Sequence, residues 1–212
     1  MEQSSQPLAN LSLEKRTSLE QRSQEKPVFP ATEQAIPPRD PSVPPPLSLA
    51  QQRLWFLAQL EPNSPLDNLP GPAVRLRGRL NVEAVQRALD AIVARHEALR
   101  TTFTTGTGNP VQVIHERRQV ALEVIDLRAW PEAEREAEAH RALHREACRP
   151  FDLARDVMLR ATLLRLGTEE HVLLLVTHQI ASDEWSTGVL YREFAAFYTT
   201  FTAGGAAPLP AL

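Results

Sequence analysis

A cluster of polar residues follows an apolar segment in the stretch "LLLVTHQIASDEWSTGVL", residues 173–190. The cluster contains His178, Gln179, Asp183 and Glu184. Histidine transfers protons near neutral pH and carboxylates accept them, so this cluster at the end of an apolar strand is typical of a catalytic loop. The residues also suit plainer roles. A lone histidine is commonly structural, and Asp183 precedes a predicted helix that it would cap.

Adjacent strand residues point to opposite faces, so only one of His178 and Gln179 can face a given pocket. A metal site made of His171, His178 and Asp183 has no recognised ligand spacing, and we expect no metal. Cys148 lies in the tail of a predicted helix without a visible catalytic partner, which favours a structural role.

A second dense polar cluster is "RHEALRTTF", residues 95–103. Cations suit the C-terminal end of a helix, so one interpretation is a solvated helix end. The other is a buried ion-pair anchor, because ionisable side chains stand beside Leu99 and Phe103. The sequence leaves both open.

The elements that must position these residues follow from periodicity and capping signals. A helix is expected after Ser48 and is stopped by Pro62; a second is capped by Asn81 and runs to about residue 99. The remaining expected elements are a half-exposed strand at 74–80, strands near 111–115 and 120–127, a charged helix at 131–149, a hairpin at 157–178 and a final helix from 185 to about 204. The second hairpin strand, 172–176, is apolar on both faces and should be central. Interleaved strands and helices predict an α/β sandwich, a mixed sheet covered by helices.

The composition argues against several classes of function, among them nucleic-acid binding and insertion into a membrane. The net charge is −3, from 23 basic and 26 acidic residues, which argues against a nucleic-acid surface. The single cysteine fits a reducing compartment. No apolar run approaches the roughly 20 residues that span a bilayer, and no secretory signal is visible. We therefore expect a cytoplasmic protein that binds neither nucleic acid nor membrane.

Three regions divide the chain. Residues 1–26 form a leader with a possible short helix, residues 27–46 hold eight prolines and are interpreted as a semi-rigid linker, and residues 47–212 are globular. Two interpretations of the leader remain open, a disordered tail and a docking element.

Four segments in order resemble the condensation domain of non-ribosomal peptide synthetases. "LSLAQQRLWFL" matches the family's opening Ser-x-Ala-Gln-x-Arg-Leu-Trp motif, "RHEALRTTF" matches the second motif, and "THQIASDEWS" aligns with His-His-x-x-x-Asp-Gly. "PFDLARDVMLRATLLRL" resembles the segment before the central hairpin, with Asp156 and Val157 where the family commonly has Gly-Pro. The resemblance runs from about Pro44 to the C-terminus. It implies a half-domain with a chloramphenicol acetyltransferase-like fold.

The resemblance also assigns roles. His178 matches the first motif histidine, but the second, which the family uses at the reaction centre, is Gln179. Asp183 matches the structural aspartate, whose expected ion-pair partner is Arg100, with Arg95 as the alternative. The motif glycine is Glu184.

The chemistry of amide formation gives these departures a consequence. The attacking amine must lose a proton, and a histidine base typically contributes about 10²–10⁴-fold to such a step. Glutamine does not titrate and only donates or accepts hydrogen bonds, although it can still orient an amine. Either the backbone at Glu184 no longer needs the freedom of glycine, or its carboxylate intrudes on the donor path. A further possibility is that Glu184 replaces the base.

The family domain is about twice this length, with two similar halves that enclose the active site. The length therefore favours an N-terminal condensation half-domain. Gln179 and Glu184 favour a half-domain that is catalytically impaired. The alternatives are an active acyltransferase completed by a partner chain or by oligomerisation, and a non-catalytic docking module of a synthetase. The expected partners are carrier proteins, other synthetase modules, a C-terminal half-domain or a second copy. No cofactor is expected, because substrates would arrive on the phosphopantetheine of carrier proteins.

Overall fold

The computed structural model describes residues 40, 43–105, 108–210 and 212. The expected leader and most of the expected linker lie outside the described residues. The end of that linker is attached to the domain. The backbone N–H of Gln112 donates to the carbonyl of Pro45 at 3.4 Å, and the Gln112 side chain donates to the carbonyl of Pro46 at 2.9 Å.

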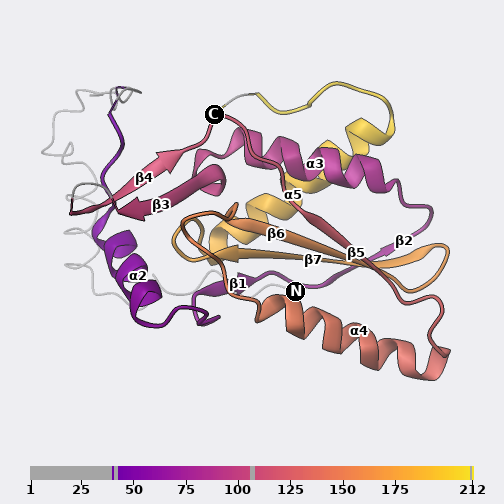
Figure 1. Ribbon diagram of the computed structural model, residues 1–212. Coiled ribbons are helices and arrows are strands. Elements are labelled where there is room, and N and C mark those ends of the chain that lie inside the picture. Colours follow the sequence, from indigo (N-terminus) through magenta and orange to yellow (C-terminus); the bar gives the residue numbers. More distant parts are fainter. Residues whose placement is uncertain (1–39, 41–42, 106–107, 211) are drawn as a thin grey trace, which may run out of the picture. The chain divides into compact units, whose positions relative to one another are not determined.

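A five-stranded mixed sheet forms the centre of the domain (Figure 1). Its strands are β1 (Asn68–Pro70), β2 (Val74–Arg77), β5 (Leu122–Asp126), β6 (Leu159–Arg165) and β7 (Glu170–His178). β7 pairs antiparallel with β6 on one side and with both β1 and β2 on the other, while β5 runs parallel to β6. Every residue of β7 after Glu170 is buried, which confirms the expected central strand.

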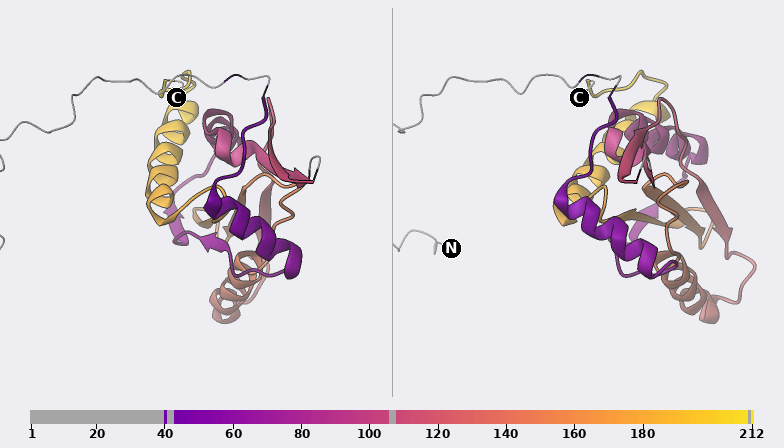
Figure 2. Two further views of the ribbon diagram at one scale, coloured as in Figure 1. Left: turned by 90° about the vertical axis from the view of Figure 1, so that its left-hand side faces the viewer. Right: turned by 60° about the vertical axis from the view of Figure 1, so that its left-hand side comes forward.

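Helices cover both faces of the sheet (Figure 2). On one face, α3 (Val82–Arg95) and α5 (Glu184–Thr202) pack against apolar side chains of β6 and β7 that include Leu163, Leu173 and Leu175. On the other face, α4 (Glu132–Ala147) packs against Leu164 and Val172. The alternation of buried faces along β7 follows the two-residue period of a strand. The α/β sandwich expected from the sequence is confirmed.

The helix after Asn81 is shorter than the sequence predicts. The Asn81 side chain caps α3 by accepting a hydrogen bond from the Ala84 N–H at 3.0 Å, but the helix ends at Arg95 instead of near Leu99. A 3₁₀ turn, η1 (Glu97–Arg100), follows it and leads into a strand, β3 (Thr101–Thr105). β3 pairs antiparallel with β4 (Pro110–Ile114) in a separate two-stranded sheet. The sequence-based interpretation missed β3, whose threonines have high strand propensity.

Helix α2 (Leu49–Leu60) brings the opening motif beside the end of β7. Ser48 and Gln51 form a capping box at its start, as the serine led us to expect. The Gln51 side chain also donates to the carbonyl of Ile180 at 3.2 Å. Leu54, Trp55 and Ala58 pack on a small cluster that contains Leu47, Phe103 and Ile180. The loop after β7 is therefore held between α2 and the sheet.

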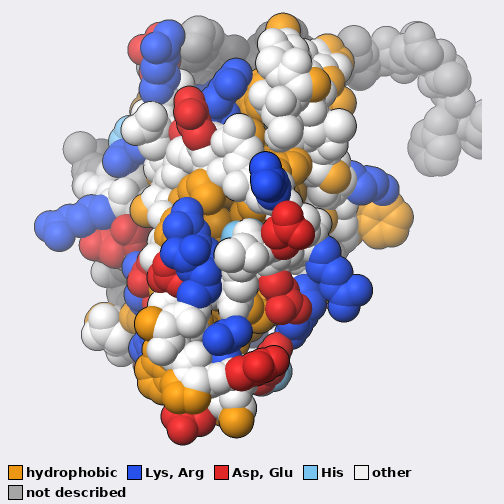
Figure 3. Space-filling model, turned by 90° about the vertical axis from the view of Figure 1, so that its right-hand side faces the viewer, with side chains coloured by type: hydrophobic (Ala, Val, Ile, Leu, Met, Phe, Trp, Pro, Cys, Tyr) orange, Lys and Arg blue, Asp and Glu red, His pale blue; other side chains and the backbone are white. Residues whose placement is uncertain are grey.

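The surface carries charges of both signs. The face in Figure 3 shows basic and acidic side chains interspersed, with no extended area of one sign. Many of these charges are paired in the domain, as in the contacts of Arg75 with Glu136 at 2.8 Å and with Glu170 at 2.6 Å. No helix of the described residues is long and apolar enough to cross a membrane.

Candidate functional site

The motif loop joins the end of β7 to the start of α5. His178 is the last residue of β7 and is only 5% exposed, whereas the next side chain, Gln179, is exposed. The buried His178 and the exposed Gln179 agree with the expectation that only one of them faces a given pocket. The backbone N–H of Gln179 donates to the carbonyl of Asp67 at 2.9 Å, which ties the loop to the segment before β1.

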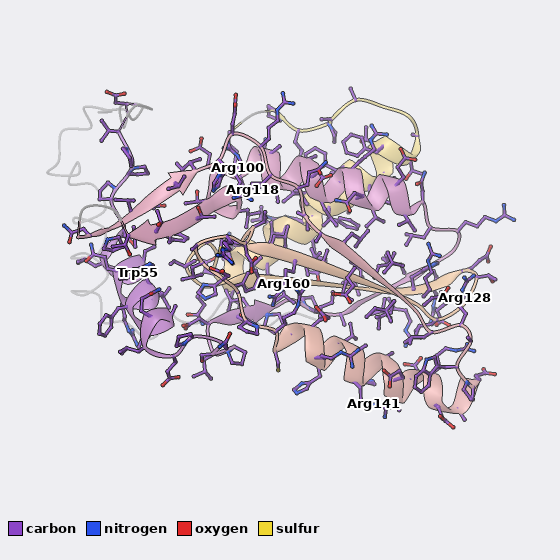
Figure 4. All side chains as sticks on the ribbon, in the orientation of Figure 1. Trp55, Arg100, Arg118, Arg128, Arg141 and Arg160 are labelled. Carbon is purple, nitrogen blue, oxygen red and sulfur yellow. The ribbon has the colours of Figure 1, made fainter. Side chains whose placement is uncertain are left out.

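Aromatic and cationic side chains pack around the His178 ring. The edge of the ring contacts Phe151 with the ring centres 5.8 Å apart, and the Arg160 guanidinium lies 3.8 Å from the centre of the same phenyl ring. Arg160 is itself buried and donates to the carbonyls of Glu146, Arg149 and Pro150. Figure 4 shows Arg160 on the sheet, well separated from Arg100 beside β3. These contacts fix the position of the imidazole.

The environment favours a neutral His178. Burial lowers the pKa of the imidazole, the nearby Asp67 acts in the opposite direction, and Arg160 lowers it further. The Ile180 backbone N–H donates to Nδ1 of the ring at 3.1 Å, so in the neutral ring the proton resides on Nε2. His178 is then able to donate a hydrogen bond from Nε2, but that nitrogen has no lone pair with which to accept a proton.

A cavity of about 620 Å³ opens beside His178. Apolar side chains of Phe103, Phe151 and Leu153 form part of its wall, and Asp67 lies at the same cavity. His178 lines this cavity and Gln179 does not.

Asp183 caps the helix that follows the loop. Its Oδ1 accepts hydrogen bonds from the Ser186 N–H at 2.8 Å and the Ser186 hydroxyl at 2.6 Å. These hydrogen bonds lower the pKa of the Asp183 carboxyl. Glu184 is the first residue of α5 and is exposed. Among the described non-glycine residues only Asn63 has a positive φ, so the backbone at Glu184 no longer requires glycine.

The expected ion pair between Asp183 and an arginine of "RHEALRTTF" is not formed among the described residues. Arg100 donates to the carbonyl of His115 at 2.6 Å and contacts Glu97 at 3.5 Å. The alternative partner, Arg95, pairs with Glu193. The Asp183 carboxylate is engaged by its own helix, and each arginine is engaged by other acceptors.

Of the two interpretations of "RHEALRTTF", the structure shows the ion-pair anchor, which joins α3 to α5. Arg95 Nε lies 3.0 Å and His96 Nε2 lies 2.7 Å from the two oxygens of Glu193. The Arg95 and Glu193 side chains are 13% and 12% exposed. This part of the cluster is therefore a structural anchor and not a solvated helix end.

The described part of the chain offers no set of ligands for a metal ion. No group of three or more histidine, cysteine or carboxylate side chains there is arranged to hold one. His171 and His178 lie seven residues apart on β7, which separates them by roughly 23 Å. Cys148 is exposed and its sulfur lies 3.7 Å from Nε2 of His144.

Sequence reasoning missed Phe151, Arg160 and Asp67 as neighbours of the loop. A partial signal was present, because Phe151 stands in the "PFDL" segment and Arg160 is a cation within the largely apolar run "MLRATLL". Asp67 carried no signal, since its proximity depends on the pairing of β1 with β7.

The family model for the condensation domain matches residues 44–212 of this chain. The chain is 50% identical over 167 residues to one of the linear gramicidin synthase proteins of Brevibacillus parabrevis, a match that covers 79% of this chain and 2% of that protein. It is 49% identical over 164 residues to chondramide synthase cmdD from Chondromyces crocatus, covering 77% of this chain and 4% of that protein. The chain thus spans a small part of the curated relatives it matches.

Solved structures show the same fold. The X-domain from teicoplanin biosynthesis matches with a TM-score of 0.70 and 36% identity, over 83% of this chain and 36% of that one. The first condensation domain of the calcium-dependent antibiotic synthetase, in complex with a substrate analogue, matches with a TM-score of 0.70 and 28% identity, over 80% and 40%. The starter condensation domain of rhizomide synthetase, at 21% identity and a TM-score of 0.72, agrees in fold.

Proposed function

Because the chain belongs to the condensation-domain family of non-ribosomal peptide synthetases, we propose that it is the N-terminal subdomain of such a domain and that its catalysis of amide formation is impaired. The reaction would join two thioester-bound groups. A carrier-bound aminoacyl amine attacks a carrier-bound acyl carbonyl, the new C–N bond forms, the C–S bond breaks, and the amine proton is removed. The observation that carries the proposal is Gln179, an exposed amide where the family's reaction-centre histidine stands.

The neighbouring histidine is a poor substitute. His178 is buried, lines a cavity that Gln179 does not line, and uses Nδ1 to accept a backbone hydrogen bond. A neutral ring with its proton on Nε2 donates a hydrogen bond from that nitrogen and cannot act there as a base. To serve the face on which Gln179 lies, the ring would have to rotate and break its contact with Ile180.

Glu184 is the other candidate base. Its carboxylate is exposed at the first turn of α5. We assign Glu184 no role as the proton acceptor, and the Glu184→Gln variant tests that assignment.

The test is a condensation assay with the whole chain, alone and mixed with the C-terminal half of a homologous condensation domain. Acyl-carrier donor and aminoacyl-carrier acceptor are supplied, and the amide product is followed by mass spectrometry. We expect no product from the unmutated chain alone and only a trace of product when the second half is present. The double variant Gln179→His, Glu184→Gly should form product with the second half, at least about 10²-fold above the unmutated mixture.

A matched control adds a histidine elsewhere. Gln119 lies outside the motif loop, so Gln119→His should leave the mixture inactive. Product from the unmutated protein at the rate of an ordinary condensation domain would refute the impairment. Activity that disappears only in the Glu184→Gln variant would instead make Glu184 the base.

A second candidate function is a docking module that binds other proteins of the synthetase without condensing substrates. The observation that favours it is the 35% identity to the teicoplanin X-domain in a structure of that domain's complex with OxyB. Titration calorimetry of the chain with purified carrier proteins and enzymes encoded beside its gene tests this function. Binding that is unchanged in the Gln179→His, Glu184→Gly variant would support docking, and absence of binding to all of them would refute it.

A further inference from the structure

A groove of about 870 Å³ runs along α5, separate from the cavity beside His178. One wall is α5, from Glu184 to Thr199, a distance of roughly 22 Å at the helical rise. The opposite wall is β1, β2 and the segment that links them. The groove is therefore elongated and suits a chain-like ligand.

The walls of the groove are mostly apolar, although two threonines and two tyrosines of α5 also line it, and they are rigidly held. Gly71 approaches α5 so closely that an added Cβ would lie 2.9 Å from the Tyr191 ring. The Tyr191 hydroxyl donates to the carbonyl of Pro72 at 2.7 Å and accepts from the Leu175 N–H at 3.3 Å. Proline has no backbone N–H, so Pro70 and Pro72 present no such donor to a ligand.

The groove has one charged end. Glu184 is the only charged residue among those that line it, and none of the described ion pairs includes Glu184. A helix N-terminus carries about half a positive charge, which the carboxylates of Asp183 and Glu184 together exceed. The end of the groove nearest the motif loop is therefore negative, and the rest is uncharged.

We propose that this groove binds an elongated apolar cation, a primary ammonium on an apolar chain, with the ammonium at Glu184 and the chain along α5 toward Thr199. A carboxylate at the end of an otherwise uncharged, mostly apolar groove selects against an anionic head group and favours a cationic one. The apolar chain gains from leaving water, by about 0.8 kcal/mol for each buried methylene group, which is about fourfold in affinity. The binding does not depend on whether the chain forms amide bonds.

The probes are octylammonium, decylammonium and octanoate, each kept below its micelle concentration and titrated into the full chain. Binding is followed by calorimetry and by the fluorescence of Trp185, which is 82% exposed and adjacent to Glu184. We expect octylammonium to bind about fivefold more tightly than octanoate, the scale of one exposed ion pair. Decylammonium should bind roughly 15-fold more tightly than octylammonium, from two further methylene groups.

Two variants locate the site. Glu184→Gln should abolish the preference for ammonium over carboxylate and leave the dependence on chain length. Gly188→Trp should lower the affinity for all three probes by at least tenfold. Gly188 lines the groove, and a Cβ added there has no protein atom within 4 Å outside its own stretch of helix, so the indole has room to occupy the space of the ligand. Glu132→Gln is the matched control, since Glu132 is also an exposed first residue of a helix but does not line the groove.

The proposal is overturned by any of three results. These are equal affinity of the unmutated chain for octylammonium and octanoate, undiminished binding to Gly188→Trp with a native circular dichroism spectrum, or no binding of decylammonium at all. None of these results bears on the condensation assay, which measures product and not groove occupancy.

Discussion

The backbone N–H of Ile180 donates a hydrogen bond to Nδ1 of His178 at 3.1 Å. This contact ties the tautomer of the first motif histidine to the turn that follows β7. The imidazole thus maintains the shape of the loop, and His178 lines the cavity while Gln179 does not. In this chain His178 is retained and supports the loop, whereas the next position carries glutamine, Gln179, in place of the family's second histidine.

The first prediction concerns pH and stability. The pKa of His178 is lower in the folded chain than its ordinary 6.5, mainly because of burial, with Asp67 raising it and Arg160 lowering it. Below pH 6.5 the unfolded chain binds a proton that the folded chain does not, so stability falls as the pH drops from about 6.5 through the folded pKa. Above pH 6.5 the contribution is fully present. Urea unfolding between pH 5 and 8 measures it.

The variants His178→Gln and His140→Gln separate this effect from other histidines. His178→Gln should make the stability less dependent on pH in that window. The pKa values of His115 and His171 are also lowered by burial, so part of the dependence should remain. His140 is exposed on α4, and its replacement should change nothing. An equal slope in the unmutated chain and His178→Gln would contradict the assignment.

The second prediction concerns Phe151, whose ring contacts both His178 and Arg160. Phe151→Leu removes that ring, so we expect the free energy of unfolding to fall by about 1–2 kcal/mol. Water should then reach the imidazole and raise the pKa of His178 toward 6.5. NMR titration of the imidazole resonances measures the pKa. Phe56→Leu is the control, because Phe56 is 56% exposed on α2 and should affect neither quantity.

Local signals account for the parts of this fold that the sequence predicts well. The Asn81 cap and the apolar stripe of α3 need only neighbouring residues to be recognised, and so does the unbroken apolar run of β7. The motif loop is equally recognisable, because its residues are contiguous and stand at the family's spacing. A structural element whose determining residues all lie in one short segment can be predicted from the pattern of that segment.

Contacts between distant segments account for what the sequence does not predict. The sequence suggests Arg100 or Arg95 as the partner of Asp183, but the choice among acceptors depends on how α5 lies against α3. The pairing of β1 with β7 brings Asp67 to the loop, and no local pattern encodes it. β3 escapes prediction because five residues that begin with a helix-end motif are too few to show a period.

The third prediction concerns the anchor between α3 and α5. Glu193→Gln leaves the guanidinium of Arg95 without its carboxylate partner in a site where both side chains are largely buried. We expect the free energy of unfolding to fall by about 3 kcal/mol, as for other broken buried pairs. Glu169→Gln is the control, because its partner Arg79 is 96% exposed and such pairs contribute about 0–1 kcal/mol. Equal effects in chemical denaturation would show that burial of the Glu193 cluster adds nothing.

The last prediction tests what Asp183 does. If the carboxylate caps α5, Asp183→Ala should lower the thermal midpoint and Asp183→Asn should preserve most of it, because asparagine is an equally good cap. If Asp183 instead paired with Arg100, both variants would lower the midpoint alike, and the effects of Asp183→Ala and Arg100→Ala would not add. The pKa of Asp183 is lowered by its bonds to Ser186, so its contribution is present above about pH 3.8 and is lost as the pH falls through the folded pKa. That acid-side loss should disappear in Asp183→Asn. Thermal melts of the three variants and the double variant at pH 3 and pH 7 decide between capping and pairing.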